Sequence, residues 1–279
     1  MAYKTVLTIV TDVSQARLQL ESAMAVARAE DAHLEVLCMG VDRTQTGYYY
    51  AGATAFVQQE VLDRAQDEAR ELERVMRERL AGAEIRWSSE AVVAQIGAIA
   101  TVVGLRARFA DLVVMGHPYG KGRGQELEAA VEAALFEGQS PVMIMPDAAI
   151  PSLAPRRVVV AWNQSNEAMN AIRKALPLLK AATLVDITVI DPPAHGPERS
   201  DPGGQLSQWL ARHGVKVEVS VLAKTLPRIS DVINRHVRDT SSDMVVMGAY
   251  GHSRFREAIL GGATRNMLEM AEVPVLMAH

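Results

Sequence analysis

Residues 242–251 read SDMVVMGAYG, and residues 110–120 carry a close copy, ADLVVMGHPYG. Each stretch is a short run of Val and Met residues that ends at a glycine. Such a run is typical of a buried parallel strand that passes into a turn. Because the same run occurs twice, the two stretches indicate an internal repeat.

The segments on either side of these stretches recur in the same order. YKTVLTIVTDVSQ at 3–15 resembles PRRVVVAWNQSN at 155–166, and SPVMIMP at 140–146 resembles VPVLMAH at 273–279. Within each copy, apolar strands alternate with segments of helical periodicity, which predicts a parallel sheet covered by helices on both faces. The sequence therefore predicts an α/β fold with two tandem domains.

A proline-rich seam separates the two copies. Residues 146–157 read PDAAIPSLAPRR, and three prolines in so short a stretch exclude a continuing helix or a central strand. We therefore predict one domain over residues 1–148 and a second over residues 155–279.

Composition is that of a globular protein without a strongly charged surface. The 279 residues suit two domains, 49% of them are hydrophobic, and the formal net charge of −4 gives no reason to expect nucleic acid or a membrane as partner. The chain lacks a long apolar run, its opening residues do not resemble a signal peptide, and its single cysteine, Cys38, is predicted to be a buried thiol. These features predict a cytoplasmic protein.

Four glycines follow the strand predicted at 244–248: Gly248, Gly251, Gly261 and Gly262. Glycine permits a positive φ and lets the backbone approach a ligand closely. Because GGATRNML opens a helix, whose first N–H groups have no partner inside the helix, the pattern predicts an anion site made mostly of main-chain donors. The alternative reading of these glycines is a loop that merely closes the strand.

The spacing Gly248-x2-Gly251-x9-Gly261 resembles the nucleotide-binding signature of the universal stress protein family, G-x2-G-x9-G followed by Ser or Thr. The resemblance covers nearly the whole chain, as two such domains in tandem. It implies Rossmann-like (adenine nucleotide α-hydrolase-like) domains, each with a five-stranded, mainly parallel sheet flanked by helices. It also implies that ATP, or else AMP or ADP, binds at the carboxyl edge of the sheet, with or without Mg²⁺.

The resemblance implies a set of nucleotide-binding residues in the second copy, at the ends of three strands and at the phosphate-binding turn. These residues are Ala161, Trp162, Asn163, Val189, Met247, Gly248, Gly251, His252, Gly261, Gly262, Ala263 and Thr264. We predict no catalytic residue and no metal ligand, because the chain shows neither a nucleophile motif nor metal-ligand spacing.

Two of these positions depart from the family pattern. Asn163 stands where ATP-binding members usually have Asp, so it brings no carboxylate for a metal. Gly262 stands where the signature has Ser or Thr, and one lost neutral hydrogen bond is typically ~1 kcal/mol, under tenfold in affinity. Thr264 offers a hydroxyl two residues further on, so we expect nucleotide binding to be weakened rather than abolished.

The first copy departs further from the signature. Gly116 and Gly120 are spaced by three residues instead of two, and Glu128 and Ala129 take the positions of Gly261 and Gly262. A carboxylate at that turn repels phosphate. We therefore expect the first domain to hold a degenerate nucleotide site, although Asp12 keeps the acid at the end of the first strand.

The preferred function is a stress-response regulatory protein, bacterial in character, that binds an adenine nucleotide in its C-terminal domain with little or no catalysis. A scaffold that binds no nucleotide is the first alternative, favoured by Gly262 and Asn163, and a slow ATPase is the second. We also expect the two copies to pack as an internal pseudo-dimer through PVMIM and PVLMA, and whole chains to form a homodimer.

Overall fold

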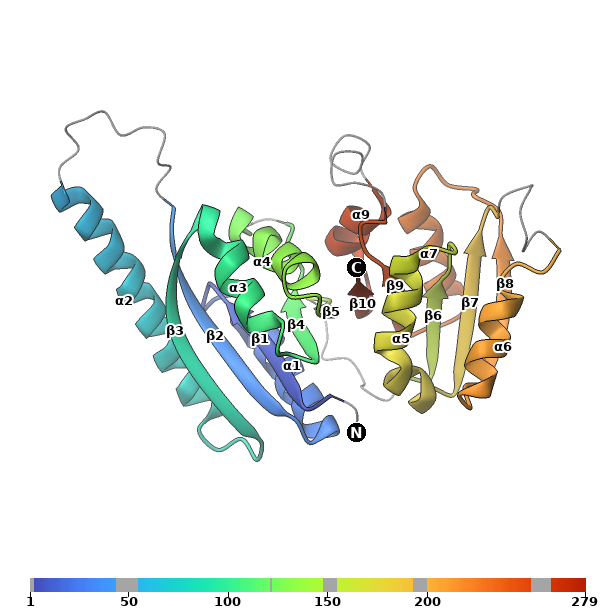
Figure 1. Ribbon diagram of the computed structural model, residues 1–279, viewed down its shortest axis with the longest axis horizontal. Coiled ribbons are helices and arrows are strands. Elements are labelled where there is room, and N and C mark those ends of the chain that lie inside the picture. Colours follow the sequence, from blue (N-terminus) through green and yellow to red (C-terminus); the bar gives the residue numbers. More distant parts are fainter. Residues whose placement is uncertain (1–2, 44–54, 121, 148–154, 193–199, 252–261) are drawn as a thin grey trace. The chain divides into compact units, whose positions relative to one another are not determined.

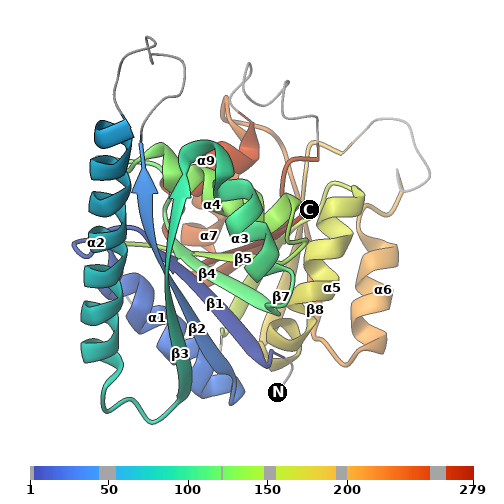
Figure 2. The same ribbon diagram turned by 60° about the vertical axis from the view of Figure 1, so that its left-hand side comes forward.

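The chain forms two compact units, Met1–Ser140 and Pro141–His279. Each is a mainly parallel sheet with helices on both faces, as Figures 1 and 2 show, which confirms the predicted α/β fold class. The computed structural model describes residues 3–43, 55–120, 122–147, 155–192, 200–251 and 262–279.

Unit 1 contains four parallel strands in the order β3-β2-β1-β4. The strands are β1 (Thr5–Val10), β2 (His33–Asp42), β3 (Arg86–Gln95) and β4 (Leu112–Gly116). The helices are α1 (Ala16–Glu30), α2 (Ala55–Leu80), the short 3₁₀ helix η2 (Ile96–Ala98), α3 (Ile99–Ala107) and α4 (Gln125–Phe136). Across the described ranges of the whole chain, no helix combines the length and the hydropathy needed to span a bilayer.

Unit 2 contains six strands in the order β5-β10-β9-β6-β7-β8. The strands are β5 (Val142–Met145), β6 (Arg157–Ala161), β7 (Leu184–Ile190), β8 (Val217–Leu222), β9 (Met244–Gly248) and β10 (Val275–Ala278). The helices are α5 (Asn166–Ala181), α6 (Gly204–Arg212), α7 (Ile229–Asp239) and α9 (Ala263–Met270). In Figure 1, α5 and α6 cover one face of this sheet, and α7 and α9 cover the other.

The strand β5 ends the first repeat in sequence but belongs to unit 2 by its contacts. It pairs antiparallel with β10, so that Met143 lies opposite Leu276. The sequence predicts the domain boundary after this strand, whereas the contacts of the folded chain place it before the strand. The reason is that the main-chain hydrogen bonds of β5 with β10 hold it in unit 2.

The strand order of unit 2 determines where a ligand can bind. The chain runs from β6 outward to β7 and β8 and then returns across the sheet to β9 and β10. The direction of winding therefore reverses between the neighbouring strands β6 and β9. In open α/β sheets, a reversal of this kind leaves a crevice outside the carboxyl ends of the strands.

Cys38 is fully buried in β2, as the sequence predicts. Burial, reinforced by the charge of Glu73, raises the pKa of its thiol to about 12, so the reactive thiolate is nearly absent at pH 8. We expect the native protein not to react with a disulfide reagent such as DTNB at pH 8, and the protein unfolded in guanidinium to release one equivalent of thionitrobenzoate. Rapid labelling of the native protein would contradict this account.

Candidate functional site

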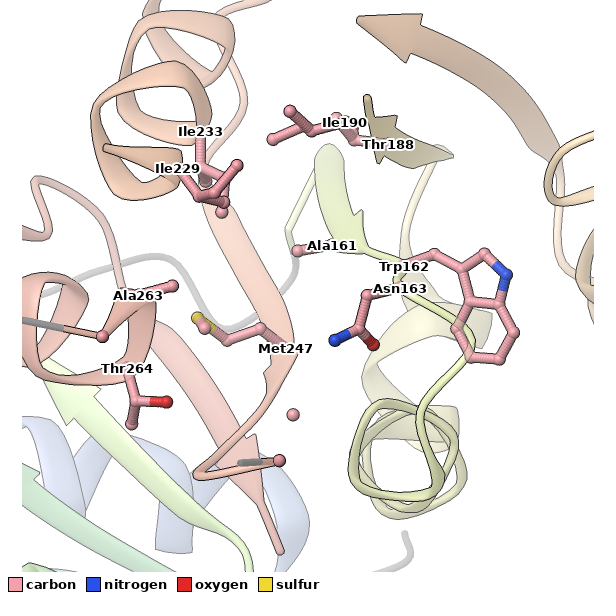
Figure 3. A pocket seen from close by; sticks show the side chains of 13 residues that line it. Ala161, Trp162, Asn163, Thr188, Ile190, Ile229, Ile233, Met247, Ala263 and Thr264 are labelled. Carbon is pink, nitrogen blue, oxygen red and sulfur yellow. The ribbon is translucent and has the colours of Figure 1, made fainter. Parts of the chain in front are cut away.

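A cavity of about 470 Å³ lies at the carboxyl edge of the unit 2 sheet (Figure 3). Its walls come from the ends of β6, β7 and β9 and from the first turns of α7 and α9. It therefore occupies the place where the winding of the sheet reverses between β6 and β9.

Most of the predicted nucleotide-binding residues line this cavity together. They are Ala161, Trp162, Asn163, Met247, Gly248, Gly251, Gly262, Ala263 and Thr264. His252 and Gly261 lie outside the described residues. The structure thus brings together residues that are about 100 positions apart in the chain, while their contact with a nucleotide stays a prediction.

Val189 lies on the opposite face of the sheet from the cavity. Its side chain is buried, and its Cγ2 atom is 3.6 Å from the position that a Cβ on Gly203, at the start of α6, would take. Because side chains alternate along a strand, its neighbours Thr188 and Ile190 face the cavity instead.

Two isoleucines from α7 form an apolar wall to which the sequence analysis assigned no role. Ile229 and Ile233 are one helical turn apart, so they present their side chains on the same side of α7. The helix is held to the sheet by a hydrogen bond of 2.8 Å between His236 Nε2 and Asp186 Oδ2 of β7, and Asp186 is fully buried. This bond positions the apolar wall over the cavity.

Asn163 presents an amide donor to the cavity. Its Oδ1 accepts the main-chain N–H of Ser165 at 3.1 Å, and the hydroxyl of Ser165 in turn caps α5 by accepting the N–H of Ala168 at 3.1 Å. This Asx turn uses the oxygen of the side chain. Figure 3 shows the amide nitrogen pointing toward Met247. Where an aspartate would offer a second acceptor, this chain offers a neutral donor.

The turn after β9 is fixed from two sides. A Cβ on Gly248 would lie 2.5 Å from the main-chain nitrogen of Ala168, so glycine is required here for the close approach of β9 to α5. Tyr250 adopts a positive φ of 55°, and its N–H donates to Thr264 Oγ1 at 3.0 Å. The Thr264 hydroxyl therefore ties the turn to α9, and its own proton remains available for another acceptor.

Gly262 is the N-cap residue of α9. Its φ of −59° and ψ of 158° are accessible to any residue, and among the described residues no side chain caps the helix there. The first N–H groups of α9 consequently have no acceptor within the helix and carry the positive end of its dipole. Gly262 lines the cavity, so this helix terminus faces the same space as Met247 and Asn163.

The described wall of the cavity carries no charged side chain. Met247, Ile190, Ile229 and Ile233 make it largely apolar. Thr188 adds a buried hydroxyl, whose oxygen has no hydrogen-bond partner in the described part of the chain. In the same part, no three His, Cys, Asp or Glu side chains are grouped so as to hold a metal ion. Chemically, the cavity suits a flat, mostly apolar ligand with an anionic end.

The corresponding region of unit 1 is built differently. When the two copies are aligned on Pro141 and Pro274, the first residue of α9, Ala263, matches Ala130. Helix α4 nevertheless begins at Gln125, five residues before that match. Glu126 in its first turn is nearly buried and accepts from Arg43 Nη2 at 2.7 Å. A carboxylate of the chain itself thus occupies the helix terminus that α9 leaves open.

Glu128, which takes the position of Gly261, is also engaged within unit 1. Its Oε1 accepts the hydroxyl proton of Tyr119 at 2.7 Å. A separate cavity of about 800 Å³ lies beside the end of β1 and the polar face of α2, and it is bordered mainly by carboxylates, among them Asp12, Asp63, Asp67 and Glu68. Neither feature resembles the neutral cavity of unit 2.

Comparison with known proteins links the unit 2 site to one family. Residues 155–279 match the model of the Universal stress protein family. A curated universal stress protein of Synechocystis sp. is 34% identical over 73 residues, which are 26% of this chain and 24% of that protein. The chain therefore spans about a quarter of the length of that relative.

Solved structures extend the likeness of fold to the whole chain. A universal stress protein from Archaeoglobus fulgidus aligns over 100% of this chain and 96% of its own length, with a TM-score of 0.73 and 17% identity. A functionally unknown protein from Pseudomonas aeruginosa aligns over 99% and 92%, with a TM-score of 0.57 and 14% identity. Residues 155–279 thus carry a domain of the Universal stress protein family, and the chain shares its fold along its whole length with a solved universal stress protein.

Proposed function

We propose that the cavity of unit 2 binds an adenine nucleotide, and that the protein is a cytoplasmic, stress-linked regulatory protein whose ligand is bound rather than turned over. The observation that carries this proposal is the meeting of an apolar, partly enclosed cavity with an uncapped helix N-terminus at the switch point of the sheet.

The base would lie against the apolar wall. Met247 borders the cavity from β9, and Ile229 and Ile233 border it from α7. A purine ring buries a large apolar face in such a slot, and burial of apolar surface contributes about 25 cal/mol per Å². This wall supplies affinity, while polar groups at its edge supply orientation.

The edge of the base would meet the main chain of Ile190. The ladder between β6 and β7 ends with Ala161 opposite Thr188, and the N–H of Trp162 donates to Thr188 O at 2.9 Å. Successive residues of a strand direct their main-chain groups to opposite neighbours. The N–H and C=O of Ile190 therefore point from β7 in the direction of β6, like those of Thr188. Because the pairing with β6 ends at Thr188, these two groups can offer a donor and an acceptor to an aminopurine.

The phosphate end would lie at the first turn of α9. Its first N–H groups, which have no acceptor within the helix, and its dipole attract an anion, and the Thr264 hydroxyl retains a proton to donate. Gly262 contributes its main chain without a hydroxyl. We therefore expect one ligand per chain, held more weakly than in a protein with Ser at this position.

Calorimetry on the purified protein tests the proposal. We expect adenine nucleotide to be released when the protein is denatured, or else one equivalent of AMP or ATP to titrate into ligand-free protein. CMP and CTP carry the same phosphates and control for the contribution of the base, so they should bind more weakly. If no heat appears at millimolar concentrations of any adenine nucleotide and none co-purifies, the proposal fails and the result favours the scaffold alternative.

Unit 1 is proposed to bind no nucleotide. Its own Glu126 occupies the helix terminus, so a phosphate there would have to displace the ion pair with Arg43. A stoichiometry of two nucleotides per chain would contradict this part of the proposal. Multiple turnovers of ATP, abolished by one substitution at the cavity, would instead favour the slow ATPase.

A further inference from the structure

We propose that the hydroxyl of Thr188 recognises the base of the bound nucleotide by donating a hydrogen bond to a ring nitrogen of the purine. This inference rests on the proposed function and adds a specificity-determining residue to the same site. Thr188 lies on β7, is 1% exposed, and lines the cavity beside Ile190 (Figure 3). It is not among the binding residues that the sequence predicts.

The hydroxyl of Thr188 is buried without a hydrogen-bond partner in the described part of the chain. The residues opposite it in the sheet are Ala161 on β6, which has no polar side chain, and Ser220 on β8. The wall that α7 contributes to the same cavity consists of Ile229 and Ile233, which are apolar. Because burial of an unpaired hydroxyl costs free energy, the cavity favours a ligand with an acceptor at this point.

Thr8 in unit 1 shows how the fold uses a buried threonine that has a structural role. It lies on β1 and is fully buried. Its hydroxyl donates to Val114 O at 2.8 Å and accepts from Gln19 Nε2 at 2.9 Å. Thr8 and Thr188 thus share residue type and burial, but they differ in whether the protein itself bonds the hydroxyl.

The position of Thr188 relative to Ile190 decides which atoms of the base it meets. The two residues project from the same face of β7, about 6.6 Å apart along the strand. The proposed site places the main-chain N–H and C=O of Ile190 against N1 and the 6-amino group of adenine. The ring nitrogens that remain as acceptors are N3 and N7, and the Thr188 hydroxyl donates to one of them.

Asp186 is the competing explanation for a polar residue at position 188. It lies two residues earlier on the same face of β7, its Oδ2 is bonded to His236 Nε2 at 2.8 Å, and its Oδ1 has no partner in the described residues. The Thr188 hydroxyl bonds to neither oxygen. A role in holding Asp186 predicts a loss of stability when the hydroxyl is removed, whereas recognition of the base predicts a loss of affinity.

The test measures the affinities of AMP, 3-deaza-AMP and 7-deaza-AMP for the full-length wild type, Thr188→Val and Thr188→Ser by calorimetry. We expect Thr188→Val to bind AMP about three- to tenfold more weakly than the wild type. Thr188→Ser keeps the hydroxyl and should bind AMP more tightly than Thr188→Val. One deaza analogue should bind the wild type more weakly and lose no further affinity in Thr188→Val, because both changes remove the same hydrogen bond.

Urea unfolding of the ligand-free proteins separates base recognition from a structural role. Thr188→Val should be at least as stable as the wild type, because it removes an unpaired hydroxyl. Thr8→Val is the matched control, which should be less stable and keep its affinity for AMP.

Three results would overturn the inference and leave the nucleotide site in place. They are an unchanged or higher AMP affinity in Thr188→Val, a lower stability of this variant without ligand, and additive losses for both deaza analogues. If the wild type binds no adenine nucleotide, the proposed function fails, and this inference fails with it.

Discussion

Replacement of Gly262 by Asp is expected to abolish nucleotide binding and to leave the fold of unit 2 intact. The backbone at Gly262 has the φ and ψ of an N-cap residue, and Asp is among the residues that prefer this position. Its carboxylate would occupy the first turn of α9, where the proposal places a phosphate. Two unit charges 4 Å apart repel by about 4 kcal/mol at an effective dielectric constant of 20, so we expect a loss of about 100-fold or more.

Gly262→Asn is the matched control for this substitution. Asn caps a helix as well as Asp does and has nearly the same size, but it carries no charge. It should keep the nucleotide affinity within a few-fold of the wild type. Gly262→Ser should strengthen binding by up to about tenfold, because it restores the hydroxyl of the family signature.

Calorimetry measures the affinities of these three variants, and thermal unfolding checks that each is folded. Equal affinities of Gly262→Asp and Gly262→Asn would show that no phosphate lies at the start of α9. Such a result would contradict the proposed position of the phosphate. It would not test the apolar wall, because neither variant changes a residue of that wall.

Replacement of Gly248 by Ala is expected to destabilise unit 2 by about 1–3 kcal/mol and to weaken nucleotide binding. The added Cβ would lie 2.5 Å from Ala168 N and 2.8 Å from the carbonyl carbon of Glu167. Both atoms belong to the main chain of α5, so no side-chain rotation relieves the overlap. The start of α5 must move, and the turn that holds Asn163 moves with it.

Urea unfolding followed by tryptophan fluorescence measures this effect, since Trp162 and Trp209 report on unit 2 and Trp87 reports on unit 1, where the control variant lies. Gly97→Ala in η2 is the control, because a Cβ there meets no atom within 4 Å and the φ at Gly97 is not positive. It should change stability by less than about 0.5 kcal/mol. Equal stabilities of Gly248→Ala and Gly97→Ala would mean that the approach of β9 to α5 is not as close as described.

The fold class follows from local patterns that the sequence displays directly. The VVMG runs become β4 and β9, each with four buried residues before a less buried glycine. The division into units depends on a contact that no local pattern reports. The sequence analysis expects PVMIM to pack against PVLMA, and β5 does pair with β10. That this pairing assigns β5 to unit 2 could be read only from the structure.

The site is predictable where a residue type or a spacing carries the information. The spacing Gly248-x2-Gly251-x9-Gly261 is recognisable in the sequence, and Gly248 and Gly251 do border one cavity together with Gly262, the residue after Gly261. The face of the sheet to which a strand residue points is harder to predict. Strand β7 is buried on both faces, so its sequence shows no alternation of polar and apolar residues. Val189 and Ile190 are equally apolar, and only the position of α6 and α7 shows which of them faces the cavity.

Two further features of the site depend on tertiary structure. Ile229 and Ile233 reach the cavity because α7 crosses the sheet at that edge, held there by the bond between His236 and Asp186. The amide of Asn163 acts as a donor because its oxygen is used by the Ser165 N–H. The residue type at 163 predicts hydrogen bonding, but only the turn decides which atom faces the ligand.

A crystal structure of the protein grown with saturating AMP tests the central claim most directly. The account predicts one ordered nucleotide per chain in the unit 2 cavity, with its base between Met247 and Ile233 and its phosphate on the first N–H groups of α9. A structure in which AMP binds elsewhere, or in which this cavity is closed by side chains of the chain itself, would contradict it.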